Sequence, residues 1–175
     1  FGHESFEQAV HGVYRVDPDG SIQLIIADSG KPNGIAISPD GATLYVVAHD
    51  DGTVRDSPAG VRVRRGRMAL LAYDLASDGT ASFREPVLEF PAPRRAPDGI
   101  KVDRQGNLWI TETNRPYGIR VITPDAQELA FIPVPDVARN LAFGHGSDAR
   151  TLYITAGGSL YRIRVEQEGY HPFRW

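Results

Sequence analysis

Short runs of β-branched, aliphatic and aromatic residues follow one another along the chain, and each run has about the length of a β-strand. Apolar positions do not recur at the spacing of an amphipathic helix, so the pattern predicts an all-β fold. Gly, Asp and Pro between the runs supply the positive φ and the fixed corners of tight turns. We predict thirteen strands: Val13–Asp17, Ile22–Ala27, Gly34–Ser38, Thr43–Ala48, Ala69–Leu75, Pro86–Phe90, Gly99–Asp103, Asn107–Glu112, Gly118–Thr123, Glu128–Val134, Leu141–Phe143, Thr151–Thr155 and Ser159–Val165.

The runs form a repeated block that opens with a polar residue. The blocks begin at Asn33, Asp98 and Asn140, and in each of them a strand that starts with Leu and an aromatic residue follows ten to twelve residues later. The block starts are 65 and 42 residues apart. The shorter spacing is typical of one four-stranded blade of a β-propeller, and the longer one fits a blade with an insertion at 49–68. This arginine-rich insertion can be interpreted as a lid for an anionic ligand or as a solvated loop.

The repeats predict part of a β-propeller. Two strands, two full blades and three further strands make three to three and a half blades, too few to close a ring. We therefore expect an N-terminal half of the propeller, in the same protein or in another chain, to complete it. The predicted division is a partial propeller at 1–165 and a C-terminal tail at 166–175; within the propeller, 1–30 end one blade, 31–95 form the blade with the insertion, 96–138 form a blade and 139–165 form the last one.

Composition excludes several function classes. The net charge of −3 and pI near 5.9 argue against a nucleic acid or an anionic membrane surface as a partner. The chain has no cysteine, which excludes thiol catalysis and Cys-ligated metal centres. No apolar stretch approaches the 18 residues that a membrane-spanning helix needs.

The polar residue that opens each block is the candidate for chemistry. Asn33, Asp98 and Asn140 hold equivalent places in successive repeats, so a propeller would bring them together around its axis. Their amide and carboxylate oxygens suit a hard cation such as calcium. In the alternative interpretation, Asn-Gly and Asp-Gly are turn residues before a strand.

The blocks also carry a family resemblance that spans about Gly12 to Val165. They resemble the SMP-30/gluconolactonase/luciferin-regenerating-enzyme family, whose members hydrolyse lactones of sugar acids and related esters. The resemblance implies a six-bladed β-propeller with one divalent metal at its axis. The segments that carry it are Lys31–Gly41 with Leu44–Val46, Pro97–Asp103 with Gly106–Ile110, and Asn140–Gly144 with Thr151–Ile163.

The resemblance also implies roles for particular residues. Asn33 and Asp98 would be metal ligands, whereas the family's third ligand, a Glu in a Glu-Gly-Pro motif, has no match in this chain. The metal would be calcium, with zinc, magnesium and manganese as alternatives, and it would polarise the lactone carbonyl toward attack by water. Asp98 is the candidate catalytic base, unless the proton leaves from metal-bound water. Asn140 and His49 are candidate substrate-binding residues.

Other functions stay open at this point. The same site could belong to a calcium- or ligand-binding propeller without turnover, or to an esterase that acts on aryl esters or organophosphates. His3, Glu7 and His11 could form a metal-binding face if they were helical, or lie in a solvated loop. No Gly-x-Ser-x-Gly motif accompanies His145, which argues against a serine hydrolase. We expect a soluble protein of the bacterial cytoplasm or periplasm, and the sequence does not choose between them.

Overall fold

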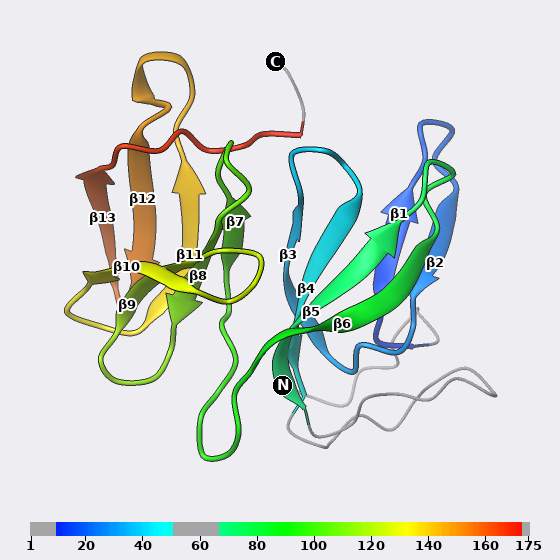
Figure 1. Ribbon diagram of the computed structural model, residues 1–175, viewed down its shortest axis with the longest axis horizontal. Helices are drawn as coiled ribbons and strands as arrows, with labels where there is room; N and C mark the ends of the chain where they lie inside the picture. Colours follow the sequence, from blue (N-terminus) through cyan, green and yellow to red (C-terminus); the bar gives the residue numbers. More distant parts are fainter. Residues whose placement is uncertain (1–9, 51–66, 173–175) are drawn as a thin grey trace.

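The computed structural model describes residues 10–50 and 67–172, and this part of the chain is built from antiparallel strands with one 3-10 turn at Gly146–Asp148 (Figure 1). The predicted all-β fold is confirmed, since each predicted run overlaps a strand. The strands are β1 (Val13–Val16), β2 (Ile22–Ile26), β3 (Pro32–Ile37), β4 (Thr43–His49), β5 (Met68–Leu75), β6 (Ala81–Glu89), β7 (Ile100–Val102), β8 (Leu108–Glu112), β9 (Gly118–Ile122), β10 (Glu128–Pro133), β11 (Ala138–Phe143), β12 (Thr151–Ala156) and β13 (Ser159–Arg164).

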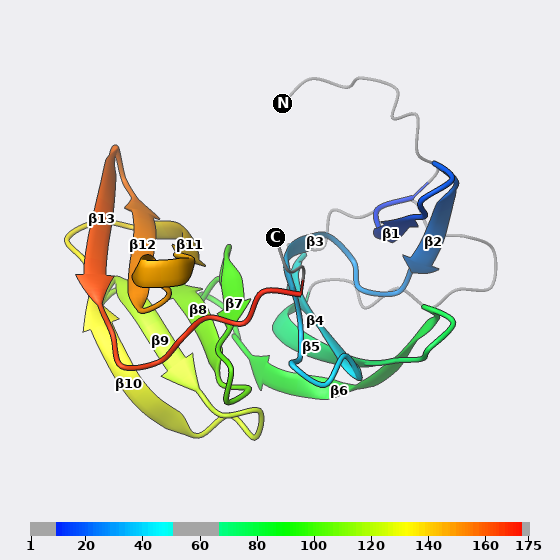
Figure 2. The same cartoon turned by 90° about the horizontal axis from the view of Figure 1, so that it is seen from above.

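The strands form four sheets in which consecutive strands pair. Their orders are β1-β2, β3-β4-β5-β6, β7-β8-β9-β10 and β11-β12-β13. Seen from above, the sheets follow one another along an arc, with β2 near one end and β13 at the other (Figure 2). The first strands β3, β7 and β11 lie on the inner side of the arc, where β7 contacts both of the others. Residues at the start of β3, β7 and β11 are therefore close to one another.

Three apolar cores join the sheets. The second strand of each four-stranded sheet is buried on both faces, because alternate side chains point into two neighbouring cores. Tyr45 and Val47 of β4 pack toward the β7–β10 sheet, and Val46 packs toward β1 and β2. Between the last two sheets, Trp109 meets Phe143 edge to face with ring centroids 5.1 Å apart. These cores fix the sheets against one another and hold the inner strands in place.

The hairpin turns use glycine where the sequence predicts it. Gly20, Gly41, Gly79 and Gly106 all have positive φ, between 73° and 91°. An L-residue with a side chain rarely adopts this conformation, so each glycine ends its tight turn without strain.

The segment after β13 returns across one end of the sheets (Figure 1). Gly169 pairs with Asp103, and the Tyr170 N–H donates to the Val102 carbonyl at 2.8 Å. The predicted tail thus ties the last sheet to the end of β7. In the described residues, no helix has the length and apolar character required to cross a bilayer.

Candidate active site

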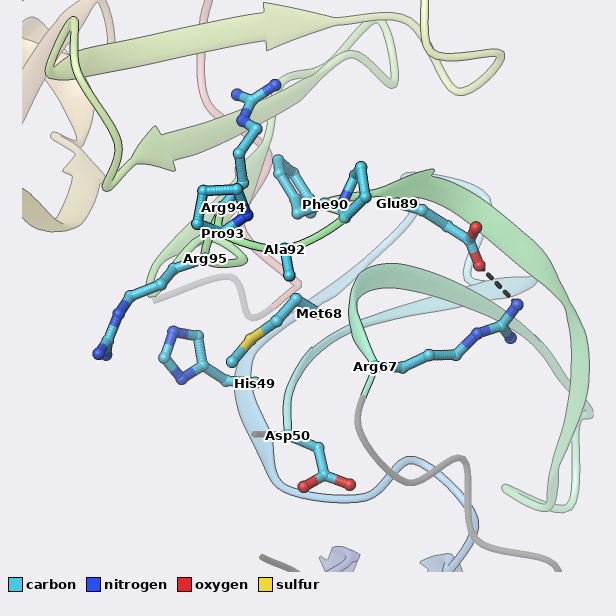
Figure 3. A pocket seen from close by; sticks show the side chains of 11 residues that line it. His49, Asp50, Arg67, Met68, Glu89, Phe90, Ala92, Pro93, Arg94 and Arg95 are labelled. Atoms are coloured by element: carbon cyan, nitrogen blue, oxygen red, sulfur yellow. Dashed lines mark ion pairs between the residues drawn. The ribbon is translucent and has the colours of Figure 1, made fainter. Parts of the chain in front are cut away.

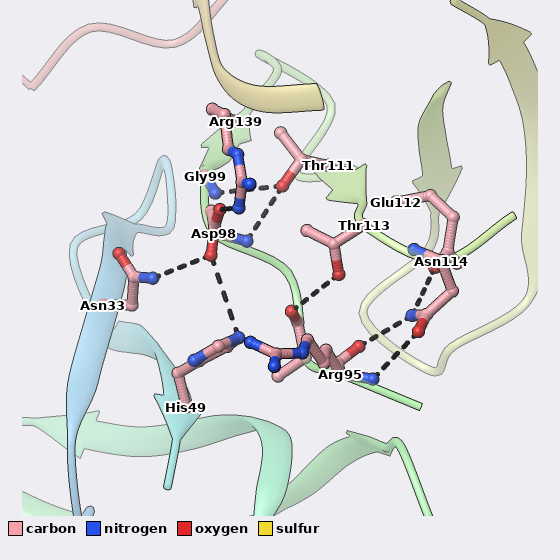
Figure 4. A network of polar contacts seen from close by, with 11 residues as sticks. Asn33, His49, Arg95, Asp98, Gly99, Thr111, Glu112, Thr113, Asn114 and Arg139 are labelled. Atoms are coloured by element: carbon pink, nitrogen blue, oxygen red, sulfur yellow. Dashed lines mark hydrogen bonds and ion pairs between the residues drawn. The ribbon is translucent and has the colours of Figure 1, made fainter. Parts of the chain in front are cut away.

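Four polar side chains from three sheets converge where the inner strands begin (Figure 4). Asn33 is the second residue of β3, Asp98 lies in the bend just before β7, and Arg139 is the second residue of β11. His49, the last residue of β4, reaches the same point. The predicted meeting of Asn33 and Asp98 is therefore observed in the structure.

The carboxylate of Asp98 is the centre of this group. Its Oδ1 accepts a hydrogen bond from Asn33 Nδ2 at 3.0 Å and lies 3.8 Å from His49 Nε2. Its Oδ2 accepts from Arg139 Nη1 at 2.9 Å. The Asp98 side chain keeps 17% of its surface exposed, so solvent reaches the carboxylate even though three side chains surround it.

The glycines after Asn33 and Asp98 have a different role from the predicted alternative. Asn33 and Gly34 lie within β3, and Gly34 and Gly99 are absent from the positive-φ residues, so neither pair makes a left-handed turn. A Cβ on Gly34 would lie 2.6 Å from the Asp98 carbonyl oxygen, and one on Gly99 would lie 2.7 Å from Asn140 Oδ1. Glycine is required because each inner strand passes very close to the next.

The donor types of Asn33 and Asp98 fit a hard divalent cation, which takes amide and carboxylate oxygens. Rotating the Asn33 amide by half a turn would bring its Oδ1 to the place of the nitrogen that now contacts Asp98. Within residues 10–50 and 67–172, no three His, Cys, Asp or Glu side chains are grouped as a metal site. A calcium-type coordination sphere would need further oxygens than these two residues supply.

A hollow of about 670 Å³ opens beside His49 and is walled by both apolar and charged side chains (Figure 3). Met68 and Phe90 form its apolar part, while Arg94 and Arg95 stand on the segment that leads to Asp98. His49 connects this hollow to the Asp98 carboxylate. Residues 51–66, the central part of the insertion at 49–68, lie outside the described residues. The predicted lid falls in this part of the chain and is not addressed.

Asn140 does not reach Asp98 in the way its neighbour does. Its Oδ1 accepts the N–H of Leu141 at 2.9 Å and packs against Gly99. Arg139 contacts the carboxylate instead, a partner that the sequence pattern does not predict. Asn140, not Arg139, holds the place in the repeat equivalent to Asn33 and Asp98, and nothing in the repeat marks an arginine as a partner of Asp98.

The remaining histidine candidates lie apart from this site. His145 stacks on His171 with ring centroids 3.7 Å apart, beside the returning C-terminal segment. Burial lowers the pKa of His171 below its usual value, and the positive charge that His145 can carry acts in the same direction. His3 and Glu7 lie outside the described residues, so the predicted face of His3, Glu7 and His11 is not addressed.

Curated relatives of the chain include several lactonases. The chain is 33% identical to the gluconolactonase of Zymomonas mobilis in an alignment that covers 93% of this chain and 43% of that protein. It is 31% identical to the pentonolactonase of Haloferax volcanii in an alignment that covers 93% of this chain and 57% of that protein. The chain thus spans about half the length of the curated relatives it matches.

Solved structures give the same picture. The gluconolactonase of Xanthomonas campestris is 33% identical and superposes with a TM-score of 0.69 over 95% of this chain and 47% of that one. Regucalcin of Agrobacterium tumefaciens, a calcium-binding protein, is 20% identical with a TM-score of 0.69 over 93% of this chain and 55% of that one, a likeness of fold. The sequence model of the SMP-30/gluconolactonase/LRE-like region family matches residues 2–158, and the chain belongs to this family.

Proposed function

We propose that this protein hydrolyses the lactone of a sugar acid, in the manner of a gluconolactonase. The observation that carries the proposal is the contact between Asn33 and Asp98 at the shared end of the inner strands, in a chain whose relatives include lactonases of two kinds. Hydrolysis of a lactone adds water to the carbonyl carbon and breaks the ring C–O bond. The proton of the attacking water must be accepted, and the ring oxygen must gain one.

Asp98 is the group proposed to accept that proton. Asn33 and Arg139 donate to its two oxygens and hold the carboxylate in an orientation that solvent reaches. The imidazole of His49, 3.8 Å away, is placed to exchange a proton with a group bound against Asp98. A divalent cation bound by Asn33 and Asp98 would polarise the lactone carbonyl and stabilise the negative charge on its oxygen.

The substrate is proposed to lie between Asp98 and the hollow beside His49. This hollow combines apolar walls with the hydrogen-bond donors of Arg94 and Arg95, a mixture suited to the carbon skeleton and hydroxyl groups of a sugar acid. We propose His49 as a substrate-binding residue because it lines the hollow. Asn140 lies outside the hollow and is proposed for the same role because it packs at Gly99, the residue after Asp98.

We further propose that the four sheets are part of a six-bladed propeller completed by an N-terminal half, from the same protein or another chain. Two observations support this. The chain spans about half the length of its relatives, and the sheet at one end of the arc leaves Val16 67% and Ile22 64% exposed. Buried against further blades, these side chains would lose that exposure.

The proposed function is tested by the Asp98→Asn variant of the complete protein. The variant keeps the size of the side chain but removes its negative charge, and we expect hydrolysis of a panel of sugar-acid lactones to fall at least about 100-fold. Circular dichroism should show an unchanged fold. Adding a chelator to the wild-type protein tests the metal in the same assay.

Two results would contradict the proposal. Hydrolysis that survives Asp98→Asn would remove Asp98 from the reaction. A wild-type protein that binds calcium but opens no lactone in the panel would instead be a binding propeller without turnover.

A further inference from the structure

The segment 94–99, which carries Asp98, is held mainly by side chains of the neighbouring strand β8, with one backbone bond at Gly99 (Figure 4). Pro97 has no N–H to give, and the backbone before β7 is irregular. Residues 111–114, at the end of β8 and just beyond it, face this segment. Each of the four contributes a polar side chain to the same network.

Thr111 holds the backbone at Asp98 itself. Its side-chain oxygen accepts the N–H groups of Asp98 at 2.9 Å and of Gly99 at 3.1 Å. Its own N–H donates to the Gly99 carbonyl at 3.1 Å. The two accepted N–H groups lie on either side of the Asp98 Cα, so together they fix the direction in which the carboxylate leaves the backbone. Thr111 is 1% exposed, and no water competes for its hydroxyl.

Thr113 and Asn114 hold the segment further upstream. The Asn114 side chain accepts the Arg95 N–H at 3.0 Å and donates to the Arg95 carbonyl at 2.8 Å, as a strand neighbour would. The Thr113 hydroxyl donates to the Ala96 carbonyl at 3.2 Å. The segment is therefore gripped at three successive points between Arg95 and Gly99.

Glu112 anchors this grip to the sheet. Its carboxylate is 3% exposed and accepts from both Arg94 and Arg120 at 2.9 Å. Its other oxygen accepts the N–H and the side-chain amide of Asn114, at 3.0 and 2.8 Å. A buried carboxylate bonded in this way holds one geometry, and it sets the orientation of Asn114.

We propose that Thr111 is a positioning residue for Asp98, supported by Asn114, and this inference rests on the proposed role of Asp98 in lactone hydrolysis. Neither residue contacts the mouth of the site through its own functional group. Both act through the backbone that aims the Asp98 side chain. A small displacement of the Asp98 carboxylate would lower the reaction rate strongly, because reacting groups must be held within a fraction of an ångström.

The test compares Thr111→Val with Thr111→Ser in the complete protein. Valine keeps the shape of threonine but accepts no hydrogen bond, whereas serine keeps the acceptor. Thr123→Val is the matched control, because the Thr123 hydroxyl also accepts a backbone N–H, that of Gln127 at 3.1 Å, in a turn remote from Asp98. Two readouts are needed: amide hydrogen exchange at Asp98 and Gly99, and kcat and KM for a lactone.

We expect exchange at both amides to be roughly fivefold faster or more in Thr111→Val, from the loss of one hydrogen bond each. Residues that hold a site's ligands or bases from behind typically change activity about 10–100-fold, so kcat should fall by that factor with KM little changed. Thr111→Ser should restore both readouts, and Thr123→Val should alter neither. If Thr111→Val does not fold, Asn114→Ala tests the supporting contact: we expect faster exchange at the Arg95 amide, whose N–H Asn114 accepts, and a smaller loss of kcat. Unchanged exchange at Arg95 in that variant would then overturn the inference.

Unchanged exchange at Asp98 and Gly99 would overturn the inference, and so would equal losses of kcat in Thr111→Val and Thr123→Val. If the wild-type protein opens no lactone, the proposed function fails. In that case the exchange readout alone decides whether Thr111 orders Asp98.

Discussion

The close approach of two backbone segments determines which residue can occupy position 34 at this site. Gly34 passes the carbonyl of Asp98 so closely that a Cβ would lie 2.6 Å from its oxygen. The neighbouring Ile100 would also be contacted, with its backbone nitrogen 3.2 Å away. These are backbone atoms, which cannot rotate away as the end of a long side chain can. The close approach is what lets Asn33 and Asp98 share one point.

Gly34→Ala should therefore destabilise the protein. Replacing glycine by alanine in open space stabilises by roughly 0.4–1 kcal/mol through the unfolded chain. At Gly34 the forced backbone shift should outweigh this, for a net loss of about 1–2 kcal/mol in the free energy of unfolding. Urea denaturation measures it. Gly158→Ala is the control, since a Cβ there meets nothing within 4 Å. Equal stability of the two variants would mean that the strands separate without cost.

At the scale of elements, the strands could be predicted almost completely and the contacts between them could not. Every run bounded by turn residues is a strand, because alternation and turn chemistry are local properties. The differences are at the ends: β6 begins at Ala81, although the prediction began at Pro86. Proline is tolerated there because β6 is the outermost strand of its sheet, next to irregular register.

The residues of the site likewise fall into those that the sequence predicts and those that it does not. Asn33 and Asp98 could be predicted because they occupy equivalent places in a repeat. Arg139 could not, because it reaches Asp98 from the neighbouring sheet, across a contact that no sequence spacing expresses. Thr111 could not, because its side chain bonds the irregular backbone before β7, which strand periodicity does not describe. The same holds for Asn114, whose two bonds to Arg95 replace a strand neighbour.

The turn between β7 and β8 is organised by a buried carboxylate. Asp103 is 0% exposed, and its oxygens accept from the backbone of Gln105 and Asn107, from the Asn107 amide and from the Trp109 indole, at 2.9–3.0 Å. Since all four partners are donors, the turn needs an acceptor on both oxygens. The indole in turn packs on Phe143 of the last sheet, so the turn and the core between sheets are coupled.

Asp103→Asn should break this arrangement. The new amide nitrogen must face either two backbone donors or two side-chain donors, and leaving them unpaired should cost about 1–3 kcal/mol in the free energy of unfolding. Asp40→Asn is the matched control in the turn between β3 and β4, because one Asp40 oxygen accepts both bonds there. Thermal unfolding of the two variants compares them directly. A loss no larger in Asp103→Asn than in Asp40→Asn would refute the account.

At the scale of the whole molecule, the arc of sheets ends in an apolar face. The pairs Val16–Ile22 and Tyr14–Leu24 of the first hairpin place four apolar side chains on one side of the sheet. Val16 and Ile22 are 67% and 64% exposed, whereas the sheets inside the arc bury their apolar faces against one another. Large exposed patches of this kind are normally covered in a working protein. The proposed occupant is the preceding part of the propeller.

Ile22→Lys in the complete protein distinguishes a covered face from an open one. If further blades pack on this hairpin, the variant buries a charge in an apolar contact and loses the burial of isoleucine. The free energy of unfolding should then fall by at least about 2 kcal/mol. Leu129→Lys is the control, because Leu129 is similarly exposed at 53%. It lies on β10, the edge strand of its sheet on the outer side of the arc. Chemical denaturation of both variants gives the comparison. A six-bladed ring requires Ile22→Lys to be clearly the more damaging; if both changes are neutral, the face stays open to solvent and the ring is not closed there.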